Sequence, residues 1–294
     1  MLQTEFLSYL TTEKRYSIHT VSGYETDLRQ FTLYCQEEYD LSDLTQATHQ
    51  LIRSWMVSLI DQGLTTRSVN RKLSTLRTYY KFLRRQRKME KDPMSKIQAP
   101  KTSKRLPVFV EEKAMENLLS VIVFDDGFMG LRDKLMVTLF YETGIRLSEL
   151  IGLRDADLNP YDHVLKVLGK RNKERLIPVS TSLKEFIFTY MQQRDAEFGP
   201  DQSEYLLVSN KGQKLNPGVV RRTVNKYLSQ VTTIEKKSPH VLRHTFATHM
   251  LNNGASLNAV KEILGHANLA ATQVYTHNTI EKLKNIHELT HPRG

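Results

Sequence analysis

Residues 238–283 read SPHVLRHTFATHMLNNGASLNAVKEILGHANLAATQVYTHNTIEKL, and the rest of the chain is organised around them. Ser238 is a candidate N-cap and Pro239 suits the first helical position, so a helix is expected to begin there. His240 and Arg243 are three residues apart and therefore share a face of that helix. A helix N-terminus carries partial positive charge and free N–H groups. The pattern therefore predicts a site for an anion.

The second half of this stretch predicts a loop histidine and a presented tyrosine. A short helix is expected from Ser256 to Leu264, where Gly265 ends it and delivers His266 to a loop. A further helical turn would then present Tyr275. Taken alone, a tyrosine is most often a half-buried aromatic side chain, so its role depends on the other residues.

A zinc site is the competing interpretation of the same stretch. His240 and His244 are four residues apart, as in zinc proteases, but that pattern requires a glutamate beside the first histidine, and Val241 stands there. Carboxylates are also scarce in 238–275, where Glu262 is the only one. We therefore expect neither a metal nor another cofactor.

An arginine follows a strongly apolar segment upstream. Residues 131–141 are apolar nearly all round, which predicts a buried central helix. Gly144 interrupts this helix, and a new one is expected to begin at Arg146. Taken alone, an arginine at such a break most often forms a structural salt bridge.

A cationic hairpin is expected next. Residues 164–169 and 175–179 predict two strands, with Lys170 leading the turn between them. A basic turn of this kind is most often simply solvated. A third short strand is expected at 205–209.

Residues 1–90 predict four helices, and the fourth, from about Thr66, has a basic face beside its apolar stripe. Within 66–105 there are 14 basic and two acidic residues. A solvated basic face is the ordinary alternative, but unpaired cations at this density suit the neutralisation of DNA phosphates. The side chains expected to contact a DNA backbone are those of Arg67, Arg71, Arg77, Lys81, Arg84, Arg85, Lys88, Lys101 and Lys104.

The totals favour two domains. The chain has 294 residues, a net charge of +10 and one cysteine, Cys35, so it can form two cores but no internal disulfide. We expect a four-helix domain at 1–91, a basic, proline-containing linker at 92–107 and a second domain at 108–294. No run approaches the ~18 apolar residues of a membrane span. The first residues, MLQTEFLSYLTTEKR, have acidic and polar residues inside their apolar pattern, unlike a signal peptide, so a cytoplasmic protein is expected.

Five motifs occur in one order along the chain: T-G-x-R at 143–146, GKRNKER at 169–175, H-x-x-R-H at 240–244, L-G-H at 264–266 and Y-T-H at 275–277. This set resembles the tyrosine recombinase (phage integrase) family and, within it, the Xer type, and the resemblance covers the whole chain. It implies a mainly α (α+β) fold. A SAM-like, four-helix core-binding domain would precede a catalytic domain with a small antiparallel β-sheet.

The resemblance also implies a reaction: DNA strands are cut and rejoined through a covalent 3′-phosphotyrosyl intermediate, without ATP or metal. Tyr275 would be the nucleophile and His240 its base, since a phenol with a pKa near 10 is barely ionised at neutral pH. The two arginines and the second histidine would hold the phosphate, and Lys170 would protonate the leaving 5′ oxygen. The implied catalytic residues are Arg146, Lys170, His240, Arg243, His266 and Tyr275.

Members of this family act as four protomers on two DNA sites and pass through a Holliday junction. The resemblance therefore implies double-stranded DNA as substrate, and a homotetramer or a heterotetramer with a paralogous recombinase. The helix expected at 278–289 would dock on a neighbouring protomer. The implied role is chromosome dimer resolution at a dif-like site in the nucleoid, with a DNA translocase as a candidate activator.

Three alternatives stay open at this point. A mobile element could encode a recombinase with the same chemistry. A non-catalytic DNA-binding regulator would explain the basic helix but not the six catalytic-type residues. A type IB topoisomerase shares the chemistry, but the chain is short for one and its first domain resembles that of the recombinases.

Overall fold

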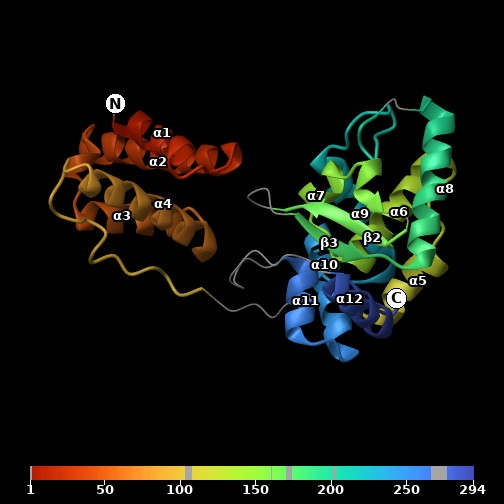
Figure 1. Ribbon diagram of the computed structural model, residues 1–294. Helices are drawn as coiled ribbons and strands as arrows, with labels where there is room; N and C mark the ends of the chain where they lie inside the picture. Colours follow the sequence, from red (N-terminus) through yellow and green to blue (C-terminus); the bar gives the residue numbers. More distant parts are fainter. Residues whose placement is uncertain (1, 103–107, 160, 170–173, 201–202, 266–276) are drawn as a thin grey trace. The chain divides into compact units, whose positions relative to one another are not determined.

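The computed structural model describes residues 2–102, 108–159, 161–169, 174–200, 203–265 and 277–294. These residues form two compact units, Met1–Arg105 and Leu106–Gly294, and each has its own hydrophobic core. The expected mainly helical fold with a small antiparallel sheet is confirmed (Figure 1).

The first unit contains the four expected helices. They are α1 (Leu2–Thr12), α2 (Ile18–Tyr39), α3 (His49–Asp61) and α4 (Thr66–Arg85), with a 3-10 turn at Leu44–Gln46. Three of the helices begin at a side-chain cap, because an oxygen of the preceding residue accepts a hydrogen bond from a first-turn N–H. The capping residues are Ser17, Thr48 and Thr65. The largest buried side chains are Trp55, Tyr79, Tyr80, Phe6 and Phe31.

A buried carboxylate joins α2 to α4. The side chain of Asp27 is 0% exposed, and it accepts hydrogen bonds from Lys72 Nζ at 3.0 Å and Thr75 Oγ1 at 2.9 Å. Arg71 forms a second ion pair with the same carboxylate. A buried charge must be compensated, so these two cations stabilise the helix packing.

The chain after α4 packs against the first unit. Met94 and Ile97 are buried in its core, Arg77 Nη2 donates to the carbonyl oxygen of Ile97 at 3.2 Å, and Asn70 Nδ2 donates to that of Pro100 at 2.9 Å. The described part of the expected linker is therefore attached to the unit that precedes it. Its role as a linker stays a prediction.

The second unit contains a three-stranded antiparallel sheet of order β1-β2-β3. Val167 of β2 pairs with Arg175 of β3. The strands are β1 (Leu158–Asn159), β2 (Val164–Leu168) and β3 (Glu174–Pro178), and a 3-10 turn at Asp155–Asp157 precedes them. The helices are α5 (Glu112–Ser120), α6 (Gly127–Thr143), α7 (Leu147–Gly152), α8 (Thr181–Phe198), α9 (Pro217–Val231), α10 (Pro239–Asn252), α11 (Leu257–Leu264) and α12 (His277–Thr290).

The hairpin was predicted correctly, but the strand expected at 205–209 was wrong. That segment forms a single bridge between Val208 and Lys214, and β1 supplies the third strand. Residues 206–208 are nevertheless fully buried. Their apolar character reflects core packing rather than a place in the sheet.

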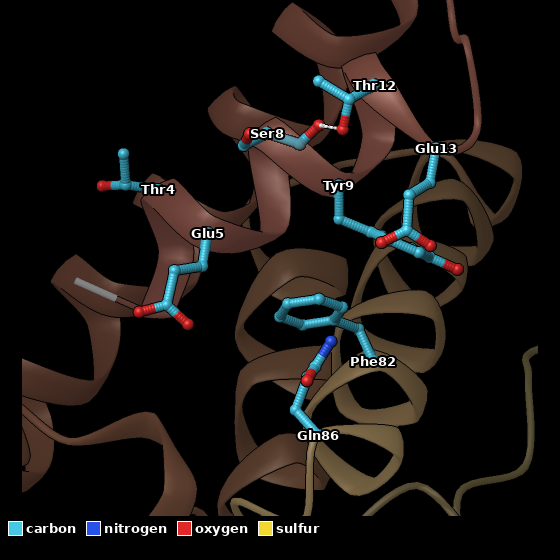
Figure 2. Close-up of a pocket in the computed structure, with 8 residues that line it drawn as sticks. All are labelled: Thr4, Glu5, Ser8, Tyr9, Thr12, Glu13, Phe82 and Gln86. Atoms are coloured by element: carbon cyan, nitrogen blue, oxygen red, sulfur yellow. Dashed lines mark hydrogen bonds between the residues drawn. The ribbon is translucent and has the colours of Figure 1, made fainter.

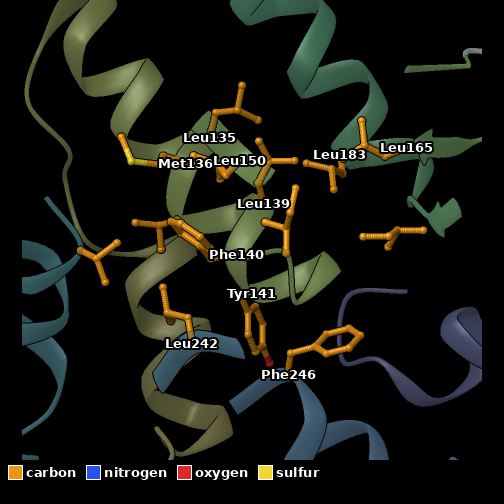
Figure 3. Close-up of a cluster of buried hydrophobic side chains, with 14 of the residues drawn as sticks. Leu135, Met136, Leu139, Phe140, Tyr141, Leu150, Leu165, Leu183, Leu242 and Phe246 are labelled. Atoms are coloured by element: carbon orange, nitrogen blue, oxygen red, sulfur yellow. The ribbon is translucent and has the colours of Figure 1, made fainter. Parts of the chain in front are cut away.

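Helix α6 is the buried central helix that the sequence predicted. Its side chains are buried on all faces from Leu135 to Thr143, and α8 and α10 pack against it. Figure 3 shows Leu139, Phe140 and Tyr141 of α6 among side chains from its neighbours, including Leu183 of α8 and Phe246 of α10. The helix ends at Gly144, which has a left-handed backbone with φ of 59°.

Helix α12 packs on its own unit, against α10, α11 and β3, with Leu283 in the core. One residue of α12 and one that follows it bind the end of α6. His287 Nε2 donates to Glu142 O at 2.8 Å, and His291 Nε2 donates to Tyr141 O at 3.1 Å. Docking of α12 on a neighbouring protomer stays a prediction.

Candidate active site

The break after α6 places Arg146 at the start of α7. The backbone N–H of Arg146 donates to Glu149 Oε2 at 2.8 Å, and its Nη1 donates to Glu149 Oε1 at 2.7 Å. The salt bridge that such an arginine usually forms is therefore present. The Arg146 side chain nevertheless stays 35% exposed. The ion pair orients this guanidinium and leaves part of it open to a ligand.

Gly144 is required at this break for a second reason besides its backbone angle. A Cβ at this position would lie 2.6 Å from Phe246 Cδ1 and 2.7 Å from Leu264 Cδ2. Helices α10 and α11 thus approach the chain closely where it turns toward Arg146. Only a residue without a side chain fits there.

Arg243 lies on α10 and is 7% exposed. Its Nη1 donates to the carbonyl oxygen of Gly144, and its Nη2 donates to that of Leu264 at 2.6 Å. One guanidinium therefore joins the end of α6 to the end of α11. Both predicted arginines meet at this junction, although they are far apart in the sequence.

A third arginine in the same cluster was not predicted. Arg175 of β3 is 4% exposed, and its Nη1 and Nη2 donate to the two carboxylate oxygens of Glu149 at 2.7 and 2.9 Å. Its Nε donates to the carbonyl oxygen of Ile263 at 2.9 Å. In the sequence it appeared as the first residue of an expected strand and the last residue of the GKRNKER motif, without a role of its own. Arg175 could have been noticed in the sequence because it is a charged residue directly before apolar residues of the expected strand.

Three successive carbonyl oxygens at the end of α11 each accept a hydrogen bond from a different arginine. Ile263 binds Arg175, Leu264 binds Arg243, and Gly265 binds Arg146 Nη2 at 3.1 Å. The last carbonyls of a helix have no partner within it and form its negative end, so cations are stabilised there.

The cluster has an excess of positive charge. Burial raises the pKa of Glu149, but the hydrogen bonds and charge of Arg175 and Arg146 outweigh this effect and hold that pKa at about 2. Burial, together with the charges of Arg146 and Arg175, lowers the pKa of Arg243 to about 9. At neutral pH three guanidiniums therefore face one carboxylate. An anion such as a phosphate would relieve the remaining repulsion.

His240 and His244 lie on consecutive turns of α10, and both are exposed. Their ring centroids are 4.6 Å apart in an edge-to-face arrangement. Partial burial of the ring, followed by the charges of His240 and Arg243, lowers the pKa of His244. His240 precedes Arg243 by one helical turn, as the spacing predicted.

The other three predicted catalytic residues, Lys170, His266 and Tyr275, lie outside the described residues. Their flanking elements are described. Strands β2 and β3 adjoin 170–173, Gly265 ends α11 with φ of 65°, and α12 begins at His277. The structure therefore brings together Arg146 and Arg243, with His240 on the same helix as Arg243. The roles of all six stay predictions.

Eight of the nine expected DNA-backbone cations lie in the described residues, and they fall into two groups. Four already have partners: Arg71 binds Asp27, Arg77 binds a carbonyl, Arg84 binds Asp92 at 3.4 Å and Arg85 binds Glu13 at 3.6 Å. These partners come from outside α4, so inspection of helical spacing did not reveal them. Lys104 lies outside the described residues. Side chains with no hydrogen bond or ion pair to any described residue are those of Arg67, Lys81, Lys88 and Lys101.

Two cavities of the first unit differ in charge. One, of about 580 Å³, is lined by Lys81, Arg84, Arg85, Arg87, Met89 and Glu90, so it extends the basic face of α4. The other, of about 720 Å³ between α1 and α4, has Glu5 and Glu13 but neither lysine nor arginine among its lining residues (Figure 2). Only the first cavity suits a polyanion.

Within the described part of the chain, no group of three or more histidine, cysteine or carboxylate side chains is arranged to hold a metal ion. In the same residues, no helix has the length and apolar character needed to cross a membrane.

The family comparison identifies the class of protein. The model of the phage integrase family matches residues 108–282, and that of the phage integrase N-terminal SAM-like domain matches residues 4–87. The chain belongs to the phage integrase family, and it is a tyrosine-type site-specific recombinase.

Its relatives define the type more closely. Tyrosine recombinase XerC of Staphylococcus saprophyticus is 37% identical over 100% of this chain and 98% of the relative. XerC of Listeria welshimeri is 36% identical with the same coverage, and XerC of Chlorobaculum tepidum is 35% identical over 99% and 94%. The Xer-type resemblance seen in the sequence is thereby confirmed.

Solved structures support the same fold. The Tn1549 transposon integrase in complex with circular intermediate DNA matches 96% of this chain and 98% of that one, with a TM-score of 0.72 at 20% identity. The XerH recombinase bound to palindromic difH substrate matches 98% and 81%, with a TM-score of 0.72 at 17% identity.

Proposed function

We propose that this recombinase cuts and rejoins double-stranded DNA through a covalent 3′-phosphotyrosyl intermediate, in the resolution of chromosome dimers at a dif-like site. The observation that carries the proposal is the cluster of Arg146, Arg175 and Arg243 around the single carboxylate of Glu149. Such a cluster suits the charge that develops on a phosphate during strand cleavage.

In the proposed reaction, the phenolic oxygen of Tyr275 attacks the phosphorus and the bond to the 5′ oxygen breaks. His240 accepts the phenol proton, and Lys170 gives a proton to the leaving oxygen. Arg146 and Arg243 stabilise the phosphorane, to which His266 adds a hydrogen bond. Rejoining is the reverse attack by a 5′ hydroxyl, so the phosphotyrosyl bond conserves the energy and ATP is not required.

The free cations of the first unit would hold the duplex. Arg67, Lys81, Lys88 and Lys101 are open to phosphates, whereas Arg71 is engaged with Asp27. Four protomers would act on two sites, either as a homotetramer or with a paralogous recombinase, and each α12 would dock on its neighbour. This role would place the protein in the cytoplasm, on the nucleoid, with a DNA translocase as a candidate activator.

The covalent step is tested with a labelled, nicked duplex that carries a dif-like site. We expect an SDS-resistant protein–DNA adduct from the wild type and none from Tyr275→Phe. An adduct that survives this substitution, or its absence in the wild type, would contradict the proposed chemistry.

The cellular role needs a separate test. We expect a footprint on the host's own chromosomal resolution site, strengthened by the paralogue if the two act together. Protection confined to the ends of a mobile element would reject chromosome dimer resolution while leaving the chemistry intact.

A further inference from the structure

We propose that Arg175 is a positioning residue for strand cleavage, which acts by fixing Glu149 and thereby the guanidinium of Arg146. The inference rests on the proposed function, because it requires Arg146 to contact the cleaved phosphate. No role for Arg175 followed from the sequence motifs.

Arg175 does not itself face a substrate. Its Nη1 and Nη2 bind the two oxygens of Glu149, its Nε binds Ile263, and only 4% of the residue is exposed. By contrast, the Arg146 side chain is 35% exposed. Arg175 therefore acts through its neighbours, and Arg146 is the group left open to the phosphate.

One residue, Glu149, links Arg175 to Arg146. The Glu149 side chain is 2% exposed, and its Oε1 accepts hydrogen bonds from both Arg175 Nη1 and Arg146 Nη1. Its Oε2 also accepts a hydrogen bond from the backbone N–H of Arg146. Loss of Arg175 would free this carboxylate to rotate, and the Arg146 guanidinium would follow it.

Arg175 also connects the three parts of the site. It lies on β3, which adjoins the hairpin turn expected to present Lys170. It binds α11 through Ile263 and packs so closely on the end of that helix that a Cβ at Gly265 would lie 2.8 Å from its Cδ. One side chain therefore sets the distance between the hairpin, α7 and the residue that precedes His266.

Lysine cannot replace arginine here. A guanidinium offers a planar fork that matches a carboxylate, plus a further N–H in the same plane. An ammonium is a single point and cannot reach both Glu149 oxygens and Ile263 O in this geometry. The conservative variant therefore keeps the buried charge but loses the orientation.

The pH dependence of the cleavage rate distinguishes a positioning role of Arg175 from a general loss of protein stability. Glu149 is ionised at all working pH values because Arg175 and Arg146 hold its pKa at about 2 against the effect of burial. Without Arg175 the effect of burial gains weight and the pKa of this carboxyl rises. Protonated Glu149 no longer attracts Arg146, so cleavage would fail at the acidic end of the pH range.

The experiment compares Arg175→Met, Arg175→Lys and Arg175→Met/Glu149→Gln with Arg194→Met as the matched control. Arg194 is also an arginine of the second unit that is 5% exposed, and it binds Asp155 through both Nη atoms at 2.8 and 2.7 Å. Its other hydrogen bonds go to Asp195 and to the carbonyl oxygens of Tyr205 and Leu206, not to the end of α11. Adduct formation on the nicked substrate is measured in single turnover from pH 5 to 9, beside DNA affinity and thermal unfolding.

We expect Arg175→Met and Arg175→Lys to lower the cleavage rate about 100-fold, as small misplacements of reacting groups do, with DNA affinity within about threefold of wild type. Arg175→Met should gain an acidic limb in its pH profile that disappears when Glu149→Gln is added. Arg194→Met should lose stability but keep the wild-type pH profile.

Three results would overturn the proposal. One is a cleavage rate and pH profile of Arg175→Met that match those of Arg194→Met. Another is an acidic limb that persists in the double variant. If Arg175→Met does not fold, a wild-type rate in Arg175→Lys serves the same purpose. Failure of the wild type to form an adduct would instead reject the proposed function itself.

Discussion

Nη2 of Arg146 donates a hydrogen bond of 3.1 Å to the carbonyl oxygen of Gly265, a residue 119 positions further along the chain. Gly265 is the left-handed C-cap of α11 and directly precedes His266. The arginine proposed to bind the phosphate is therefore hydrogen-bonded to the residue at which the expected catalytic loop begins. Four testable consequences concern this junction, the residues around it and the basic helix.

Gly144→Ala should destabilise the second unit by about 2–5 kcal/mol, from a left-handed alanine and from overpacking. The added Cβ would meet Phe246 and Leu264 at 2.6 and 2.7 Å. Gly254→Ala is the control, because its φ is also positive, at 97°, but nothing lies within 4 Å. Denaturant unfolding measures both variants. Equal losses would show that the close approach at Gly144 has no energetic effect.

The second unit should lose stability as the pH falls below about 6.5. Burial lowers the pKa of His287, and of His291 well below its usual value, so both are neutral when folded and take up protons on unfolding. Stability is therefore complete above the unfolded pKa and falls by up to about 1.4 kcal/mol per pH unit for each histidine below it. Glu142, whose pKa burial raises, acts in the opposite direction.

Calorimetry of His291→Gln between pH 5 and 7.5 tests this prediction. We expect a shallower pH dependence than in wild type, because one titrating group is lost while a side-chain N–H is kept. The exposed His19 provides the control His19→Gln. Fluorescence of the single tryptophan, Trp55, reports the first unit separately. An unchanged slope in His291→Gln would contradict the assignment.

Chelation of metal ions should not affect cleavage. In the proposed scheme, the guanidiniums of Arg146 and Arg243 supply the phosphate stabilisation for which other enzymes use Mg²⁺. Adduct formation in EDTA is expected to stay within about twofold of the untreated rate. A large loss in EDTA that Mg²⁺ restores would require a different scheme.

Lys81 and Arg71 should have different functions although both lie on the basic helix α4. Lys81 has no partner among the described residues, so Lys81→Ala should reduce the salt dependence of DNA affinity by about one phosphate contact, a change in slope of about 0.9. Arg71, in contrast, binds the buried Asp27. Arg71→Ala should therefore lower the stability of the first unit by about 1 kcal/mol.

Both measurements are made on each variant, because the contrast between them is the test. DNA affinity is titrated at several salt concentrations, and unfolding of the first unit is followed by Trp55 fluorescence. If Lys81→Ala destabilises the first unit, or if its salt slope equals that of wild type, the division of α4 into free and engaged cations is wrong.

Much of the fold was accessible from local patterns. Side-chain caps such as Ser17 and Thr65 mark helix starts, and Gly144 marks the break before Arg146, because capping and left-handed turns depend on a few adjacent residues. The prediction of a strand at 205–209 was wrong because it rested on a local pattern alone. A short apolar run shows burial but does not distinguish a strand from a buried irregular segment.

The sequence by itself determined the class of fold, the elements and the order of the motif residues, since spacing and composition are properties of the chain. Only the tertiary structure revealed that Arg175 holds Glu149 and that Arg71 holds Asp27. These partners lie 26 and 44 positions apart. Ion pairs of this kind form when packing brings distant segments together and removes water, so no local pattern encodes them.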